Sequence, residues 1–542
     1  MMASFDAIIV GGGHNGLVCA GYLAGAGLRV AVLERAAILG GPAAKREFLP
    51  GYFTTFSNSP GSLEPKIVRD LELERHGLVF KRQDPILVHP LEDGRLFVGW
   101  RERERNAAQL EAFAPGEAAR YDRFFKFFQD FADKLGISLF RPPPTLQELV
   151  RNLTTLEDQE AFSRMFFGSL RDMLDEFMLA PETQAILGPL GTVGGNVAPS
   201  TPGTAFNYLV RPLSLASVAA DSGYDPRRMP LRGSTGLPVG GMGAIIEAMI
   251  ACARGRGVVL RSETPVAGIL IRAGEACGVV TAAGEEVEAP IVVAACHPRI
   301  TVMDLVGDEP DWRDLKAKMA RKRMVGKSYK LVLALDGLPR YAAAAQGEHE
   351  LLAGAQFRIA PSLDYLEEAH MDMMLGRPTL KPVIWGLCPS VGAPELAPKG
   401  RHVMSLNIGN APYDLKGTDW DTERDLLAKR CIEAVARWVP NLPDIVTDYR
   451  CVDPREVESE LGLWGANITH GDMQPWNQFW MRPLPGLHDY RTPTRGLYLS
   501  GVGTWPGNYV SGIPGHNTAQ AILGDLAEKR IAIARKTKVM MG

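Results

Sequence analysis

The fold of this chain is decided by one stretch, Ala7-Ile8-Ile9-Val10-Gly11-Gly12-Gly13-His14-Asn15-Gly16. Its first four residues are apolar, which is typical of a short strand buried on both faces of a parallel sheet. The strand leads directly into a G-x-G-x-x-G pattern. Residues 17–24 then predict a helix, and residues 29–33 predict a second strand that ends at Glu34. This order of elements predicts a βαβ unit that binds a dinucleotide.

The residues of this unit are the first candidates for cofactor binding. Gly11 permits a tight turn, Gly13 lets backbone N–H groups approach a pyrophosphate, and Gly16 lets the helix pack close to the strand. Asn15 lies in the same loop. Glu34, 18 residues beyond Gly16, is placed to accept hydrogen bonds from ribose hydroxyls, and its charge would repel a 2′-phosphate. The unit therefore disfavours NADP.

The loop after Glu34 carries further candidates. Arg35 follows the acid directly. Gly40 and Gly41 form a second glycine pair, at a point where the loop must pass close to a ligand or to another backbone segment. We expect all three residues to contribute to the cofactor site.

A second glycine-rich loop lies almost the whole length of the chain away. Residues 497–500 form another short apolar run, which opens into a loop that begins with Gly501-Val502. A helical run is predicted from residue 518. Gly512 and Ile513 precede it, where N–H donors and a helix dipole would face the pyrimidine edge of a flavin. Two such loops predict one long ligand held at both ends, and FAD fits this arrangement better than NAD.

These motifs resemble those of the phytoene desaturase-related FAD oxidoreductases. The resemblance rests on the fingerprint at residues 10–16, on Gly40-Gly41, on the segment 238–244 and on the ending at 498–515. It is strongest for the branch that contains the oxygen-dependent carotenoid ketolases and pyridine nucleotide-disulfide oxidoreductase domain-containing protein 2. The resemblance implies an FAD cofactor whose adenine contacts the backbone of Val266.

The resemblance also implies a discontinuous organisation within the α/β class. A Rossmann-like FAD-binding domain of the GR2 type, similar to that of amine oxidases, would comprise residues 1–105, 232–308 and 486–542. An inserted α+β substrate domain would comprise residues 106–231 and 309–485. We expect the inserted domain to be partly helical and a candidate for contact with a membrane surface.

His470 and Tyr509 are the candidates for catalysis, and both lie in segments that resemble the family. His470 would titrate near neutral pH and accept a proton as a double bond forms. The alternative is that His470 is a buried, hydrogen-bonded residue that orients its loop. Trp505 and Tyr509 depart from related carotenoid enzymes, which tend to have a histidine and small glycines here. These rings would narrow the space over the flavin, which favours a smaller, partly polar substrate over a long polyene.

Composition and charge limit the partners. The chain has 542 residues, with 59 Lys and Arg against 62 Asp and Glu, and a formal net charge of −3. This balance excludes nucleic acid as a default partner, because phosphate binding depends on clustered basic residues. The 7 cysteines include no C-x-x-C pair, which predicts a reduced compartment and no metal site. We expect a cytoplasmic protein, with peripheral membrane contact left open. The sequence gives no indication of the oligomeric state.

Three functions are consistent with these observations. The first is an FAD-dependent oxidoreductase that removes two electrons, in a desaturation-type reaction, from an apolar or isoprenoid-like small molecule. The second is an oxygen-using flavin oxidase or ketolase that acts on a smaller, partly polar substrate. The third is a non-catalytic, FAD-bound regulatory protein. For the two enzymes, oxygen or a quinone would accept the electrons.

Overall fold

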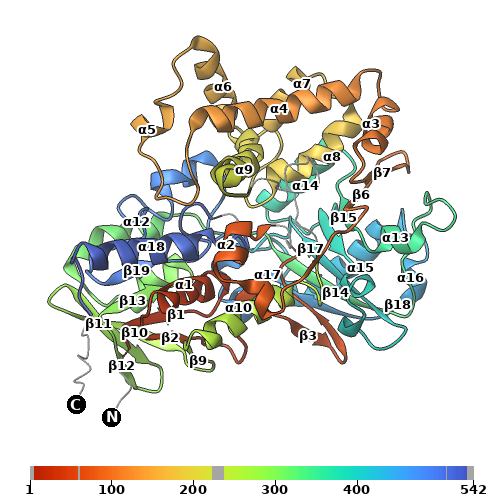
Figure 1. The fold of residues 1–542 in the computed structure, drawn as a ribbon. Helices are drawn as coiled ribbons and strands as arrows, with labels where there is room; N and C mark the ends of the chain where they lie inside the picture. The colour runs from red at the N-terminus through yellow and green to blue at the C-terminus, as the bar shows by residue number, and fades with distance from the viewer. Residues whose placement is uncertain (1–4, 59–61, 223–236, 508, 534–542) are drawn as a thin grey trace.

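A five-stranded parallel sheet carries the predicted nucleotide-binding unit (Figure 1). The computed structural model describes residues 5–58, 62–222, 237–507 and 509–533. In it β1 pairs in parallel with β2 on one side and with β13 on the other, and all three strands are buried. The strands, in sheet order, are β19 (Leu497–Leu499), β13 (Ile291–Ala294), β1 (Ala7–Val10), β2 (Val30–Leu33) and β9 (Val259–Arg261).

Three helices pack beside this sheet: α1 (His14–Gly25), α10 (Gly243–Gly255) and α18 (Ile513–Ala527). The predicted βαβ unit is therefore confirmed. Helix α18 begins five residues before the predicted start at residue 518, since Pro514 is tolerated in a first helical turn. Because the carboxyl ends of parallel strands meet at one edge of a sheet, the loops after β1 and β19 open at the same edge. The two ends of the chain thus supply one site.

A second, seven-stranded sheet lies beside the first unit (Figure 1). Its strands, in order, are β18 (Val446–Val452), β14 (Tyr329–Leu335), β17 (His402–Ile408), β16 (Ile384–Leu387), β15 (Gln356–Ile359), β6 (Leu87–Pro90) and β7 (Leu96–Gly99). Strands β6 and β7 fall within the predicted segment 1–105, yet β6 pairs with β15 of the inserted segment. The predicted boundary at residue 105 therefore does not follow the sheets. The boundary at residues 231 and 232 lies outside the described residues, and the rest of the division stays a prediction.

Smaller sheets complete the strand layers. A three-stranded antiparallel sheet packs against β13, one antiparallel pair contacts strands β17 and β18 of the seven-stranded sheet, and a second antiparallel pair joins two distant segments of the chain. Their strands are β10 (Val266–Arg272), β11 (Glu275–Thr281) and β12 (Glu286–Glu288), then β3 (Arg46–Leu49) with β4 (Tyr52–Thr54), and β5 (Phe80–Lys81) with β8 (Leu237–Pro238).

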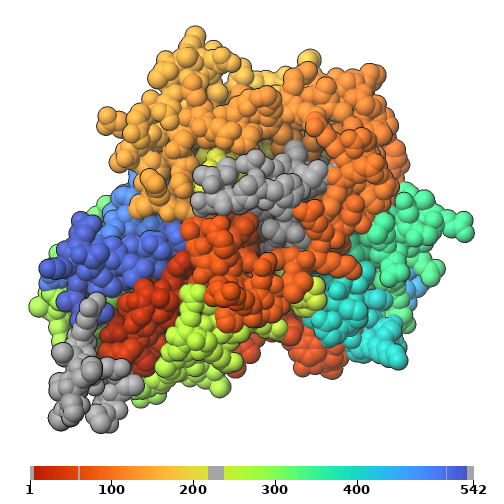
Figure 2. All heavy atoms as spheres, viewed as in Figure 1, coloured from red at the N-terminus to blue at the C-terminus, as the bar shows by residue number. Residues whose placement is uncertain are grey.

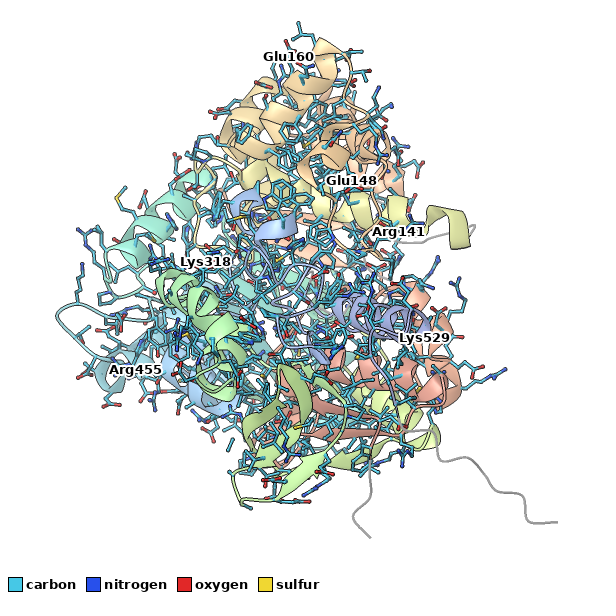
Figure 3. All side chains as sticks on the ribbon, turned by 90° about the vertical axis from the view of Figure 1, so that its left-hand side faces the viewer. Arg141, Glu148, Glu160, Lys318, Arg455 and Lys529 are labelled. Carbon is cyan, nitrogen blue, oxygen red and sulfur yellow. The ribbon has the colours of Figure 1, made fainter. Side chains whose placement is uncertain are left out.

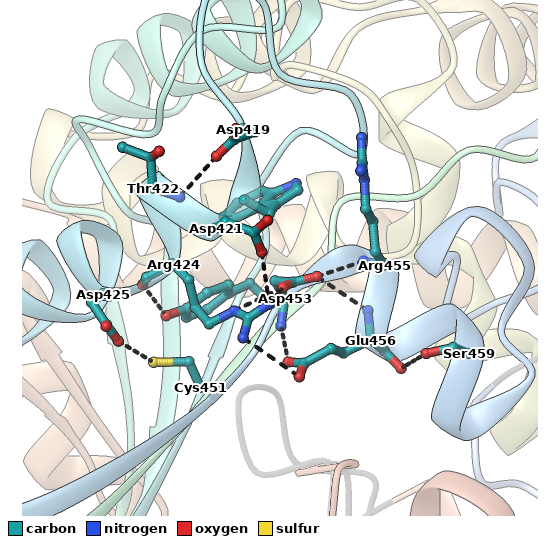
Figure 4. A network of polar contacts seen from close by, with 12 residues as sticks. Asp419, Asp421, Thr422, Arg424, Asp425, Cys451, Asp453, Arg455, Glu456 and Ser459 are labelled. Carbon is teal, nitrogen blue, oxygen red and sulfur yellow. Dashed lines mark hydrogen bonds and ion pairs between the residues drawn. The ribbon is translucent and has the colours of Figure 1, made fainter.

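A polar network fastens the edge strand β18 to its neighbouring helices (Figure 4). Asp453 is 1% exposed and caps α17 (Pro454–Leu461) by accepting from the N–H groups of Arg455 and Glu456. The same carboxylate accepts a hydrogen bond of 2.9 Å from Nε of Arg424 on α15 (Trp420–Ala436). Because this acid is buried and fully paired, the network holds β18, α15 and α17 in one arrangement.

Helices from residues 103–222 form a layer over the two sheets, across the top of the molecule (Figure 2). Their core is aromatic: Phe124, Phe128 and Phe131 of α4 are buried, as the spacing of that helix predicts. Figure 3 shows Glu148 and Glu160 within this helical layer. Lys529, which follows α18, lies outside the layer in the same view. The helices are α3 (Arg103–Glu111), α4 (Glu117–Leu135), α5 (Leu146–Val150), α6 (Leu156–Phe167), α7 (Leu170–Glu176), α8 (Pro181–Thr192) and α9 (Asn207–Ser222).

No helix in the described ranges combines the length and the apolar character that crossing a membrane requires. The predicted peripheral contact of the helical layer with a membrane stays a prediction.

Candidate functional site

One cavity lies at the carboxyl edge of the parallel sheet. It receives residues from both glycine loops and from the inserted segment, so chain segments nearly 500 residues apart line the same space. Most of the predicted site residues line it: Gly11, Gly13, Asn15, Glu34, Arg35, Gly41, Val266, His470, Gly501, Val502 and Tyr509.

The other four predicted residues shape the loops around the cavity. At Gly16, a Cβ atom would lie 2.2 Å from the carbonyl oxygen of Gly11, so only glycine fits. The N–H of Gly40 donates to the carbonyl oxygen of Gly12 over 2.8 Å. Gly512 has a φ of 78° and caps α18, whose first residue, Ile513, is fully buried. Their contribution to cofactor binding stays a prediction.

Glu34 is held at the end of β2 by two backbone groups. Its Oε2 accepts from the N–H of Gly12 over 2.8 Å, and its Oε1 accepts from the N–H of Ala36 over 2.9 Å. Each carboxylate oxygen retains a lone pair that can accept from a ribose hydroxyl. The arrangement fits the ribose role that the sequence predicts for this residue.

The site also fits a pyrophosphate. Gly13 caps the N-terminus of α1, and a Cβ atom there would meet no atom within 4 Å, so the cavity is open at this point. Arg46 lines the same cavity, and its buried Nε has no hydrogen-bond partner. A helix N-terminus and an unpartnered guanidinium nitrogen together suit an anion. Arg46 is not predicted from the sequence, because its only signal there is a position shortly after the second glycine pair.

Two histidine rings meet at another part of the cavity. The rings of His297 and His470 have centroids 4.4 Å apart. Burial, together with the positive charge of Arg482, lowers the pKa of His470 to about 3. Burial also lowers the pKa of His297 well below its ordinary value. The expectation that His470 titrates near neutral pH is therefore wrong, because a charged imidazole would be desolvated here.

His470 and Tyr509 share an unusual backbone conformation. Their φ angles are 54° and 52°, in the left-handed region that side-chain-bearing residues rarely adopt. Such strain, of order 1 kcal/mol or more, clusters at functional sites. The phenol of Tyr509 faces Gly194, where a Cβ atom would lie 2.7 Å from its oxygen. Burial raises the pKa of this phenol, so it stays protonated near neutral pH.

Lys330 belongs to a run of basic residues that predicts a solvated helix face, but this residue lies on the buried strand β14 beside the cavity, so that prediction is wrong for it. Its Nζ donates to Asn407 Oδ1 over 2.8 Å and to Ser405 Oγ over 2.6 Å, and Asn407 lines the cavity. Burial lowers its pKa well below the ordinary value for lysine. Two further acceptors, the carbonyl oxygen of Phe56 and Oδ1 of Asn58, each lie 3.2 Å from Nζ, so four hydrogen-bond acceptors surround this amine at the edge of the site. No local pattern identifies it, because its neighbours come from a distant strand.

The chain is similar in sequence to several flavoproteins over nearly its full length. It is 29% identical over 559 residues to the protein of Rattus norvegicus named pyridine nucleotide-disulfide oxidoreductase domain-containing protein 2, covering 96% of this chain and 94% of that protein. It is 22% identical to the neurosporene-forming phytoene desaturase of Cereibacter sphaeroides, covering 96% and 94%.

The fold is shared with solved oxidoreductases. A putrescine oxidase variant superimposes with a TM-score of 0.60 at 14% identity, covering 98% of this chain and all of that one. An oxidoreductase of Methanosarcina mazei superimposes with a TM-score of 0.59 at 15% identity, covering 96% and 99%. These likenesses confirm the predicted α/β FAD-binding fold.

The family assignment rests on most of the chain. Residues 16–512 match the family model of flavin-containing amine oxidoreductases. This match confirms the predicted FAD cofactor and the predicted relation to the phytoene desaturases. The chain belongs to the family of flavin-containing amine oxidoreductases, and it is an FAD-dependent oxidoreductase.

Proposed function

We propose that this enzyme catalyses the two-electron dehydrogenation of a small molecule with a substantial apolar part. The observation that carries the proposal is the continuity of one cavity from the glycine loops to His470 and Tyr509. Near these residues the lining includes the apolar side chains of Ile468, Val502 and Val510. Such a lining favours an apolar reacting group over a strongly polar one.

The bound FAD supplies the chemistry, because a flavin accepts two electrons, commonly as a hydride. The residues of the chain bind and orient. Glu34, Arg46 and the N-terminus of α1 would hold the ribose and pyrophosphate, while the loop of Gly501 approaches the opposite end. Tyr509 is the group in the cavity that is placed to move a proton, at its phenolic oxygen, and Lys330 orients the side chain of Asn407 at the edge of the cavity.

The phytoene desaturases among the similar proteins support a desaturation-type reaction. The expectation that the ring of Trp505 narrows the space over the flavin has no support from the cavity lining, which does not include this residue. The ring is packed in the core, where it stacks on Phe479 with centroids 4.8 Å apart and its indole N–H donates to the carbonyl of Arg141. This ring is fixed on both sides and cannot swing aside easily. An oxidase that acts on a partly polar molecule is the alternative enzyme.

Anaerobic reduction of the flavin tests the proposal. Purified enzyme is mixed without oxygen with a panel of apolar and partly polar alcohols, amines and alkenes, and bleaching of the flavin band is followed. Air is then admitted. Rapid reoxidation with peroxide release identifies an oxidase, and slow reoxidation identifies a dehydrogenase that uses another acceptor such as a quinone. If no member of the panel bleaches the flavin, the proposed substrate class is overturned.

Variants connect the result to the site. Tyr509→Phe should slow flavin reduction at least about tenfold without loss of bound FAD, because it removes only the phenolic oxygen. Tyr365→Phe is the matched control, since its hydroxyl bonds to the carbonyl of Pro382 outside the cavity. Equal rates in both variants would remove Tyr509 from the reaction.

A further inference from the structure

A row of side chains crosses one face of the seven-stranded sheet. Lys330 on β14 pairs with Asn407 on β17, Asn407 pairs with Trp385 on β16, and Trp385 pairs with Arg358 on β15. Residues that pair directly on neighbouring strands project from the same face of a sheet. The four side chains therefore form one line, which runs from the flavin cavity toward the helical layer.

The middle of this row is open. Asn407 lines the flavin cavity, and Trp385 retains partial exposure although β16 is an interior strand of the sheet. The guanidinium of Arg358 stacks on the indole of Trp385, with its carbon 4.4 Å from the ring centroid. The indole thus lies between Asn407, which lines the flavin cavity, and a cation, while Trp385 and Arg358 themselves lie beyond the residues that line this cavity.

Arg358 is a buried cation without a compensating charge. It is 8% exposed, and its Nε and Nη1 have no hydrogen-bond partner. The titratable groups that interact with it are His89, Tyr121 and Tyr208. None of these three side chains is a carboxylic acid. In the part of the chain that the structure describes, no Asp or Glu forms an ion pair with it. Burial lowers its pKa only to about 10, so it stays charged near neutral pH.

Comparison with other buried arginines shows how unusual this is. Arg482 is fully buried too, but its terminal nitrogens donate to carbonyl oxygens that include those of Asp472 and Val502. Arg424 pairs with the buried carboxylate of Asp453. A buried guanidinium that lacks both kinds of partner is costly, and a bound anion would offset that cost.

We propose that Arg358 binds an anionic group of the substrate, a carboxylate or a phosphate. The apolar part of the substrate lies over Trp385, and its reacting end lies in the flavin cavity near Asn407. Two strand spacings separate Asn407 from Arg358, about 10 Å between their backbones. The substrate is then an amphipathic small acid or phosphate ester. The position of the reacting end in the flavin cavity rests on the proposed function. Anion binding at Arg358 does not depend on it.

Binding of simple probes to the FAD-loaded enzyme tests the inference. The probes are 4-phenylbutanoate, phenyl phosphate and the neutral 4-phenylbutanamide, and calorimetry gives each Kd. We expect at least one anion to bind about tenfold or more tightly than the amide. Arg358→Met should remove this preference. Arg437→Met is the matched control, because Arg437 also stacks on a tryptophan, Trp438, but is exposed. The anion with the lower Kd shows whether the charged group of the substrate is a carboxylate or a phosphate.

The outcomes separate the two proposals. Equal Kd values for anions and amide in the wild-type enzyme overturn the inference, and so does an anion preference that persists in Arg358→Met. If Arg358→Met does not fold, Arg358→Lys keeps the charge but not the planar fork and should bind the anion more weakly. None of these measurements needs turnover. A substrate panel that fails to bleach the flavin, together with preserved anion preference, would count against the proposed reaction alone.

Discussion

The backbone N–H of Gly12 donates a 2.8 Å hydrogen bond to the carboxylate of Glu34, joining the first glycine loop to the end of β2. Glu34→Gln replaces one acceptor oxygen with an amide donor, which cannot accept from Gly12 or Ala36 and a ribose hydroxyl at once. We expect FAD to bind at least about tenfold more weakly, or about 1.4 kcal/mol. Titration of apoprotein with FAD measures this, with the exposed Glu288→Gln as control. Unchanged affinity in Glu34→Gln would refute the ribose role.

Gly13 and Gly16 should respond differently to the same substitution. In Gly16→Ala the new Cβ meets the carbonyl oxygen of Gly11 at 2.2 Å, so the helix or the turn must shift. We expect a loss of roughly 1–3 kcal/mol of folding free energy. In Gly13→Ala the Cβ meets no protein atom within 4 Å and the φ of −68° suits alanine, but the methyl group enters the cavity.

Thermal unfolding of the two apoproteins and the FAD content of the two holoproteins separate these effects. Gly13→Ala should unfold like the wild type yet carry little FAD. Gly16→Ala should unfold at a lower temperature in the absence of any cofactor. The opposite pattern, with FAD retained in Gly13→Ala, would mean that the cofactor does not pass close to the first loop.

The sequence predicts this loop well because its signals are local. The apolar run of β1, the glycine spacing and the acid at the end of β2 lie within about thirty residues, and each has one physical meaning. The row from Lys330 to Arg358 has no such signal. Its order depends on strand register between segments that are distant in the chain, which tertiary packing sets.

The sequence does not predict the sheet to which β6 belongs, for the same reason. Its parallel pairing with β15 joins residues near 88 to residues near 357, and no pattern in either stretch names the partner. His470 illustrates a different limit. Its position in the cavity follows from the resemblance, but its low pKa follows from burial, which the sequence does not show.

Acid should destabilise this protein through its buried histidines. The pKa is lowered to about 3 for His470 and to about 4 for His14, below the ordinary value of 6.5 in the unfolded chain. Between these values and pH 6.5 the unfolded chain binds more protons, so stability is full above pH 6.5 and falls as the pH decreases. Unfolding by urea at pH 5.0, 6.0 and 7.5 should show this loss.

His470→Gln should flatten that pH dependence, because it removes one of the groups that the unfolded chain protonates. A slope that is identical in His470→Gln and in the wild type would mean that His470 is not held neutral by burial.

Arg482 should control whether the loop of His470 and the loop of Val502 hold their shape. Its guanidinium is fully buried and donates to the carbonyl oxygens of Thr469 and Asp472 in one loop and of Val502 in the other. Arg482→Met leaves these carbonyls without a donor, at a cost of at least about 3 kcal/mol.

We expect Arg482→Met to unfold at lower denaturant concentration and to retain little FAD, since His470 and Gly501-Val502 line the cavity on these same loops. Arg482→Lys keeps the charge but has no fork that can span both loops, so it should recover stability only in part. Arg495→Met, at an exposed arginine paired with Glu275, is the control. Wild-type FAD content and stability in Arg482→Met would show that the loops hold their shape through their own backbone contacts, such as the hydrogen bond from the N–H of Thr504 to the carbonyl oxygen of Gly501.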